Sequence, residues 1–100
     1  MLPKKKNKIV LTPNACFDHD LDNYYITVEL PGVTKDNVEL NMSEQSFCVK
    51  GIREDSELLG CWYLAHPVQE GKAKAKYDNG LLSVMVPIKK PVKGKKIQVE

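Results

Sequence analysis

The sequence predicts an all-β fold, an antiparallel β-sandwich of about seven short strands. The strongest observation is the Asn79-Gly80 dipeptide, which suits the two successive positive φ angles of a type I′ hairpin turn. Residues on both sides of this turn follow a period of two, as in two paired strands. Before the turn, Ala73, Ala75 and Tyr77 alternate with lysines. After it, Leu82, Val84 and Val86 are separated by Leu81, Ser83 and Met85. Further alternating segments recur at short spacing with turn residues between them, which is the pattern of a β-sandwich.

Length and composition set the broad class of protein. The chain has 100 residues, which fits one domain with one core. Its formal net charge of +2 creates no strong field for nucleic acid or anionic membranes, and no apolar run approaches the roughly 20 residues that span a bilayer. The start MLPKKKNKIVL holds no apolar stretch of secretory length, so we expect a cytoplasmic protein.

The three cysteines, Cys16, Cys48 and Cys61, are an odd number without the spacing of a metal site. We expect them to be unpaired and to behave as small hydrophobic side chains in a reducing compartment. No metal or other cofactor is expected, because the alternating aspartates of 18–22 lack the glycine and distal glutamate of an EF-hand loop.

Residues 1–23 are interpreted as a short polar N-terminal arm with a first short strand at 9–11. The lysines at 4–6 form a basic tip that we expect water to solvate. Residues 16–20 are interpreted as a polar turn that leads into the next strand.

The following elements are predicted from alternation and turn chemistry. Pro31 and Gly32 fit the central positions of a type II turn, and Thr34 is suited to cap one helical turn. Strands are expected at 24–30, 38–42 and 47–50.

The second half of the chain begins with REDSELLG at 53–60, which is charged and has no strand period, so we interpret it as a loop. A strand is expected at 61–65, followed by a connection at 68–72 and then the hairpin. Pro87 removes a ladder donor and ends the last strand of the hairpin.

The predicted division of the chain is an arm at 1–23, a sandwich domain at 24–88 and a basic, proline-broken extension at 89–100. The extension ends in an apolar pair, Ile97 and Val99. Two alternate side chains on an extended segment suit docking into an apolar slot beside a sheet edge. A last strand of the same sandwich explains the spacing equally well.

No catalytic constellation occurs in the sequence, so we do not expect an enzyme. Cys61 and His66 have opposite parity in the expected strand and would point to opposite faces of the sheet. The sequence also lacks a serine nucleophile elbow, a phosphate loop and an HExxH motif.

Lys72, Lys74 and Lys76 would line one face of the first hairpin strand. Sheets that bind nucleic acid usually add aromatic side chains on the same face, whereas Tyr77 has the opposite parity. Lysines on an edge strand also block unwanted strand pairing. Nucleic acid is therefore not an expected partner.

Four short motifs occur along the chain in order. ITVELPGV at 26–33 is a strand ending in L-P-G-V, and FCVKG at 47–51 is similar to L-x-I-x-G. A-x-x-x-N-G-x-L is matched by Ala75, Asn79, Gly80 and Leu82 and continues as V-x-V-P to residue 87. An Ile-x-Val motif closes the chain at 97–99. In this order the motifs resemble those of the α-crystallin domain of small heat-shock proteins.

The resemblance implies an immunoglobulin-like sandwich that is no enzyme and acts as an ATP-independent holdase. Such a chaperone offers apolar surface reversibly to partly unfolded client proteins and prevents their aggregation. Family members form homodimers or larger homo-oligomers, and the tail motif of one subunit docks between two edge strands of a neighbour. The resemblance thus implies that Ile97 and Val99 dock on the groove candidates Val38, Leu40, Met42, Ala73 and Ala75.

Two features depart from the family pattern. The N-terminal arm is short and polar, and the loop at 53–60 is too short for the strand that many members exchange between dimer partners. A dimer through another edge, or a small assembly held by the tail, is therefore expected. The alternative is a co-chaperone adaptor similar to the CS domain, which has the same sandwich without the exchanged strand. A basic-faced nucleic-acid-binding module is the more distant alternative.

Overall fold

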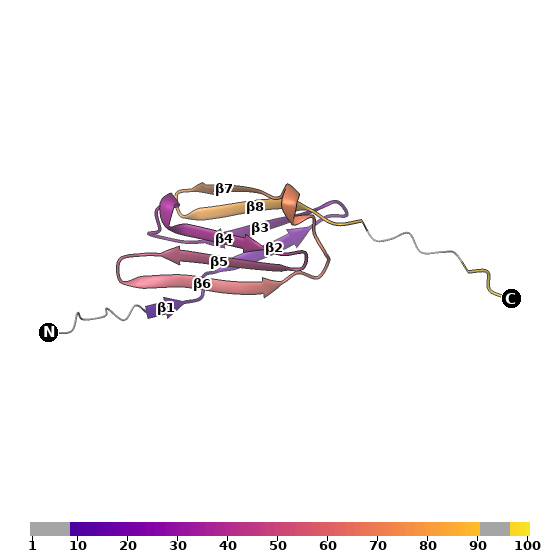
Figure 1. The fold of residues 1–100 in the computed structure, drawn as a ribbon, viewed down its shortest axis with the longest axis horizontal. Coiled ribbons are helices and arrows are strands. Elements are labelled where there is room, and N and C mark those ends of the chain that lie inside the picture. The colour runs from indigo at the N-terminus through magenta and orange to yellow at the C-terminus, as the bar shows by residue number, and fades with distance from the viewer. Residues whose placement is uncertain (1–8, 91–96) are drawn as a thin grey trace.

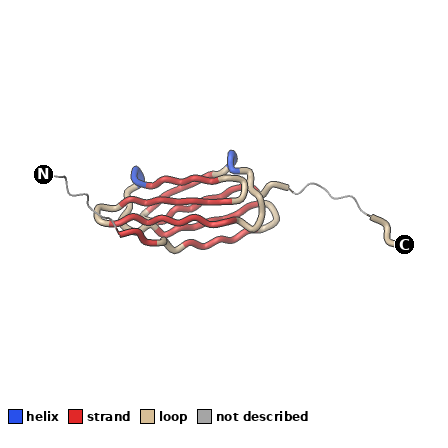
Figure 2. Tube along the Cα trace, turned by 60° about the horizontal axis from the view of Figure 1, so that its bottom comes forward, coloured by secondary structure: helices blue, strands red, loops and turns tan. Residues whose placement is uncertain are grey.

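The computed structural model describes residues 9–90 and 97–100 and contains eight strands in two sheets (Figure 1). Two short 3-10 turns, η1 and η2, lie near the two ends of the sandwich (Figure 2). The predicted all-β sandwich is confirmed, with eight strands where about seven were expected. The elements are β1 Ile9–Leu11, β2 Ala15–His19, β3 Asn23–Glu29, η1 Lys35–Asn37, β4 Val38–Met42, β5 Ser46–Ile52, β6 Ser56–Tyr63, η2 Glu70–Lys72, β7 Lys74–Asp78 and β8 Leu81–Pro87.

The strand order is β1-β6-β5-β4 in one sheet and β2-β3-β8-β7 in the other. Neighbouring strands are antiparallel, except that β1 runs parallel to β6. Phe17 on β2 contacts Phe47 and Trp62, with ring centroids 6.1 and 5.5 Å apart, so β2 faces β5 and β6 across the core. β4 and β7 are therefore the edge strands of the two sheets on the other side of the sandwich.

The core lies between the two sheets and is filled by every second side chain of each inner strand. Tyr24, Ile26 and Val28 of β3 are buried, as their alternation predicts, while Tyr25 on the same strand is exposed. Fully burying such a side chain stabilises the fold by about 1.5–3 kcal/mol. The other buried apolar residues are Leu30, Val33, Phe47, Val49, Leu58, Leu64, Val68, Leu82, Val84 and Val86.

Both predicted tight turns are present. Asn79 and Gly80 have φ angles of 48° and 83°, so the β7–β8 hairpin has the two positive φ values that a type I′ turn needs. Gly32 has a φ of 79°, and the Val33 N–H donates to the Leu30 carbonyl at 3.2 Å, as in a type II turn. The helical turn after Thr34 is also present, although the Thr34 side chain makes no capping hydrogen bond to the backbone.

Two predictions about element boundaries were wrong. Residues 53–60 are not a loop, because β6 begins at Ser56 and ends at Tyr63, before the predicted end at residue 65. Two of its three inward positions up to residue 60 are Ser56 and Gly60. Because neither is a large apolar residue, the alternation of apolar and polar residues that indicates a strand is absent from the sequence there. Residues 16–20 are not a turn either, because most of them belong to β2, which pairs with β3 along its whole length.

The expectation of unpaired cysteines was also wrong. Cys48 and Cys61 form a disulfide between β5 and β6, where they are directly opposed in the ladder with Cα atoms 4.1 Å apart. Their side chains leave the outer face of the sheet, because the neighbouring Phe47 and Val49 point into the core. Only Cys16 is a free cysteine among the described residues, and it is exposed.

Candidate functional site

The predicted docking groove is bordered by β4 and β7, which are the edge strands of the two sheets on one side of the sandwich. Each presents one ladder side that no described strand of the chain occupies. The turn at 30–33 lies beside them, held by the Tyr77 hydroxyl of β7, which donates to the carbonyls of Val33 and Leu30 at 2.6 and 3.0 Å. Burial raises the pKa of this hydroxyl above its ordinary value.

On β4, the three groove candidates Val38, Leu40 and Met42 are half-buried and pack against the edge of the core. The alternate residues Glu39 and Asn41 are exposed on the outer face. An apolar row that is only half covered at the open edge of a sandwich can accept further apolar side chains. The β4 candidates thus share one parity and one row.

On β7, the side-chain parity that the sequence left open is decided by the register. Ala75 lies opposite Val84 and Tyr77 opposite Leu82, and both partners are buried, so this parity faces inward. Ala73 has the same parity just before the strand and packs against the core, whereas Ala75 is exposed. Both alanines have small side chains and share the inward parity of β7.

The tail motif lies apart from this edge in the single chain. Ile97 is 82% exposed and Val99 is 92% exposed, which is unusual for two aliphatic side chains at alternate positions. Residues 97–100 form no strand, so the alternative interpretation of the tail as a last strand of the same sandwich was wrong. The predicted basic tip at 4–6 and the segment 91–96 before the tail lie outside the described residues.

The extension leaves the sandwich at a fixed point. The Ile88 N–H donates to the Asp22 carbonyl and the Lys89 N–H to the Pro67 carbonyl, both at 2.8 Å. The Lys89 ammonium also lies 3.0 Å from a Glu44 carboxylate oxygen. Both side chains of this ion pair are more than half exposed, so it contributes little stability.

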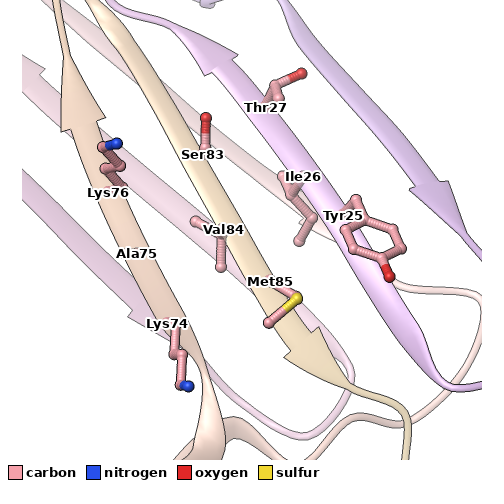
Figure 3. A pocket seen from close by; sticks show the side chains of 9 residues that line it. All are labelled: Tyr25, Ile26, Thr27, Lys74, Ala75, Lys76, Ser83, Val84 and Met85. Atoms are coloured by element: carbon pink, nitrogen blue, oxygen red, sulfur yellow. The ribbon is translucent and has the colours of Figure 1, made fainter.

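The lysines of the hairpin lie on the outer face of the sheet, with the parity opposite to that of the groove candidates on β7. Lys74 is opposite Met85 and Lys76 is opposite Ser83, and both lysines are exposed. Figure 3 shows them beside a hollow of about 370 Å³ on the outer face of the sheet, with Tyr25 on the other side of it. Their parity is therefore opposite to that of Ala73 and Ala75, the groove candidates of β7.

No cluster of catalytic type forms among the described residues. His66 lies beside His19, with ring centroids 4.9 Å apart, and its backbone N–H donates to the Tyr24 hydroxyl. Cys61 is held in the disulfide and is not available as a nucleophile. Within residues 9–90 and 97–100, no three histidine, cysteine, aspartate or glutamate side chains converge on a possible metal position.

The hairpin between β2 and β3 carries one carboxylate with a shifted pKa. The backbone N–H groups of Asn23 and Asp22 donate to the Asp20 carboxylate at 2.7 and 2.8 Å and lower the pKa of Asp20. The Tyr25 hydroxyl donates to the same carboxylate at 3.1 Å, and this bond raises the pKa of Tyr25. These shifts arise from a structural turn and mark no active site.

Sequence reasoning missed the role of Tyr77 in fixing the turn at 30–33. Its alternation with the lysines indicated which face it occupies, but the two carbonyl acceptors lie 44 and 47 residues away in the chain. It also missed Arg53, whose guanidinium donates to the Ser56 hydroxyl and to the Pro31 carbonyl. The contacts of Tyr77 and the bond from Arg53 to Pro31 join residues 22–47 positions apart, so they leave no local signal.

A small β-sandwich with a half-buried apolar row on an edge strand and an exposed apolar tail motif offers apolar surface of the kind that polypeptide segments contact. Residues 17–100 match the model of the Hsp20/alpha crystallin family. The chain belongs to this family, and it is a chaperone of the small heat-shock type. Family members are generally not enzymes.

Curated relatives and solved structures agree with this assignment. The chain is 28% identical to small heat shock protein C4 of Rickettsia felis, over 97% of this chain and 69% of that protein. It is 26% identical to a probable 15 kDa heat shock protein of Leptospira interrogans, over 96% and 84%. The fold is similar to that of heat shock protein 16.0 from Schizosaccharomyces pombe, with a TM-score of 0.71 at 21% identity, over 90% of this chain and 99% of that chain.

Proposed function

We propose that this chaperone works as an ATP-independent holdase that assembles through its own tail. The observation that carries the proposal is the pair of exposed aliphatic side chains, Ile97 and Val99, in a chain whose β4–β7 edge offers a half-covered apolar row. Two alternate side chains on an extended strand match a slot beside a sheet edge. Partly unfolded clients present the same chemistry, which is apolar side chains on extended backbone.

The tail of one subunit docks on Val38, Leu40 and Met42 of a neighbour, with Ala73 and Ala75 forming the other wall. By buried area, the two tail side chains contribute about 3 kcal/mol together before the cost of ordering the tail. Such a contact is weak alone and becomes strong when an assembly repeats it. A weak contact also exchanges readily, so the same groove is released to clients.

The remaining parts of the proposal concern organisation, assembly and location. The division into an arm at 1–23, a domain at 24–88 and an extension at 89–100 stays a prediction, although β1 and β2 show that residues 9–19 add two strands to the sandwich. The proposed partners are client proteins and further copies of the chain. Nucleic acid, membrane and cofactor have no part in this mechanism, and no reaction is catalysed.

A cytoplasmic location stays a prediction as well. None of the helical elements in the described part of the chain is long and apolar enough to cross a membrane. The Cys48–Cys61 disulfide weighs against the premise from which the cytoplasm was predicted, because reducing compartments keep thiols unpaired. Trapping the thiols in living cells before extraction shows which form exists there.

Holdase activity predicts that the protein suppresses the heat-induced aggregation of a model client when ATP is absent. Light scattering at increasing ratios of chaperone to client measures the suppression. A client that aggregates unchanged in excess chaperone contradicts the proposal. Added ATP is the control and is expected to change nothing.

Tail docking predicts that the double change Ile97→Ala and Val99→Ala lowers the mass of the assembly. Removing most of the apolar area of the tail removes most of the estimated 3 kcal/mol per contact, which weakens each contact by about a hundredfold. Light scattering after size-exclusion chromatography measures the mass. The matched control is Gln98→Ala, which alters the polar residue between the two and is expected to keep the mass. An unchanged mass in the double variant rules out docking through these side chains.

A further inference from the structure

The outer face of the β2-β3-β8-β7 sheet carries an ordered set of side chains that the tail-docking groove does not use. In one cross-strand row, Asp18, Tyr25, Met85 and Lys74 lie opposite one another from β2 to β7. The parallel row holds Cys16, Thr27, Ser83 and Lys76. Figure 3 shows the β3, β8 and β7 members of both rows around the hollow of about 370 Å³.

Beside the hollow, charge on this outer face changes sign from one edge to the other. The β2 edge carries Asp18, and Asp20 lies just beyond it, whereas the β7 edge carries Lys74 and Lys76. Glu29 of β3 and Asp78 of β7 are the acidic residues of the next row, where both strands end. Tyr25 and Met85 occupy the two central strands and are 41% and 39% exposed. An apolar centre between opposite charges is a pattern that another copy of the same face can complement.

Symmetry decides how two such faces can meet. A two-fold axis parallel to the strands, running between β3 and β8, places the β7 edge of one copy over the β2 edge of its partner. An axis perpendicular to the strands and through the centre of the hollow would instead place Lys74 of one copy over Lys76 of the other. The first arrangement pairs opposite charges and the second pairs like charges, so the charge pattern selects the first.

We propose that the outer face of the β2-β3-β8-β7 sheet is a homodimer interface with its two-fold axis parallel to the strands. In this arrangement Lys74 of each copy meets the other copy's acidic β2 edge at Asp18, and this contact occurs twice. Each Tyr25 ring meets the sulfur of a Met85, a favourable pairing of a thioether with an aromatic ring. Face-to-face sheets lie about 10 Å apart, a gap that a long lysine and a short aspartate together bridge.

The size of the face sets the expected strength of the dimer. Four strands about 4.8 Å apart, with five to seven residues at about 3.4 Å each, present roughly 20 Å by 20 Å. This area, about 400 Å² per copy, is roughly half of what each partner buries in a standard interface and is of the size of weak, transient contacts. The dimer is therefore weak and depends on protein concentration. It also supplies a two-fold contact in a chain whose turn at 53–55 leaves no room for an exchanged strand.

Charge reversal tests this interface, and sedimentation velocity over a range of concentrations gives the dimer dissociation constant. All variants carry Ile97→Ala and Val99→Ala, so that assembly through the tail does not contribute. Asp18→Lys and Lys74→Glu should each weaken the dimer at least tenfold, because each change places like charges together at both symmetry-related contacts. Both residues are exposed, so the fold is expected to tolerate the changes.

Recovery of dimerisation when both charges are reversed identifies Asp18 and Lys74 as the residues that meet across the interface. A chain with both Asp18→Lys and Lys74→Glu should dimerise like the parent, because its charges are exchanged but still complementary. An equal mixture of the two single variants should also recover, since every contact in the mixed dimer is then of opposite charge. Lys35→Glu on η1 changes the net charge equally, lies away from the face and should have no effect.

Three outcomes overturn the proposal. The first is a parent chain with the altered tail that is monomeric at every concentration tested. The second is a dissociation constant that the single reversals leave unchanged, and the third is a doubly reversed chain that does not dimerise like the parent. Unchanged reversals with a persisting dimer would point instead to the free part of the β6 edge at 59–63. The proposal does not rest on holdase activity, and the aggregation assay on the same variants reports that activity separately.

Discussion

Replacing Phe47 by alanine is expected to lower the free energy of unfolding by about 3–5 kcal/mol. The Phe47 side chain on β5 is completely buried. It meets Phe17 of β2 edge-on, with ring centroids 6.1 Å apart, and lies 6.0 Å from the Trp62 ring of β6. Its removal therefore leaves a cavity where the two sheets meet and deletes two ring contacts, each of about 0.5–1.5 kcal/mol.

Urea denaturation followed by far-ultraviolet circular dichroism measures this loss. The matched control is Tyr63→Ala on the neighbouring strand β6, where the removed ring is 93% exposed. That control is expected to change the free energy of unfolding by no more than about 0.5 kcal/mol. Equal stability of the Phe47→Ala variant and the parent chain would mean that the ring is not at the centre of the core.

Reducing the Cys48–Cys61 disulfide is expected to lower the free energy of unfolding by about 3 kcal/mol, the value of a short closed loop in the chain-entropy model. The bridge closes a loop with a sequence separation of 13 and so restricts the unfolded chain. For a domain of this size, a loss of 3 kcal/mol corresponds to a fall in melting temperature of roughly 12–24 °C. The bridge lies on the outer face of the sheet, so its loss leaves the core intact.

Thiol titration and thermal unfolding check this second prediction together. The denatured, unreduced protein should show one free thiol, that of Cys16, and three after reduction. The double variant Cys48→Ser and Cys61→Ser should melt like the reduced parent, whereas Cys16→Ser should melt like the oxidised parent. Three free thiols before any reductant is added would refute the bridge.

The hairpin and the inner strands were predictable because their signals are local. Asn79 and Gly80 are among the few residues that tolerate positive φ, so they fix the turn whatever surrounds it. On β3, Tyr24, Ile26 and Val28 are large and apolar at every second position, and the period of two is plain. For these elements, residues adjacent in the sequence are sufficient to predict the structure.

The start of β6 was not predictable because its inward positions lack apolar bulk. Ser56 is buried and accepts a hydrogen bond from the Arg53 guanidinium, which satisfies its hydroxyl. Gly60 is buried as well, and any side chain there would collide with the indole of Trp62. A serine and a glycine at core positions remove the pattern on which the prediction depends.

The disulfide was missed for the same reason. Cys48 and Cys61 become opposite partners only when β6 begins at Ser56 and pairs antiparallel with β5. With residues 53–60 taken as a loop, no register placed the two cysteines together. Cysteine spacing alone, without that register, gives no pairing.

The inward-facing parity of the groove candidates was easier to predict on β4 than on β7. Val38, Leu40 and Met42 share one parity, so their common row followed from alternation alone. For Ala73 and Ala75 the inward parity needed the β7–β8 register, because the lysines between them gave no apolar contrast. Whether the tail occupies this groove depends on a second copy of the chain, which no local pattern describes.

The cluster of Phe17, Phe47 and Trp62 gives the protein its own optical probe. Trp62 is the single tryptophan of the chain, and its indole lies against rings from both sheets. Its emission spectrum should therefore report whether the sheets are docked, independently of the backbone signal that reports the strands. A state in which the strands persist while the sheets have separated would appear as a red-shifted tryptophan with unchanged circular dichroism. In an aggregation-preventing protein, that comparison distinguishes partial opening of the chaperone from its complete unfolding.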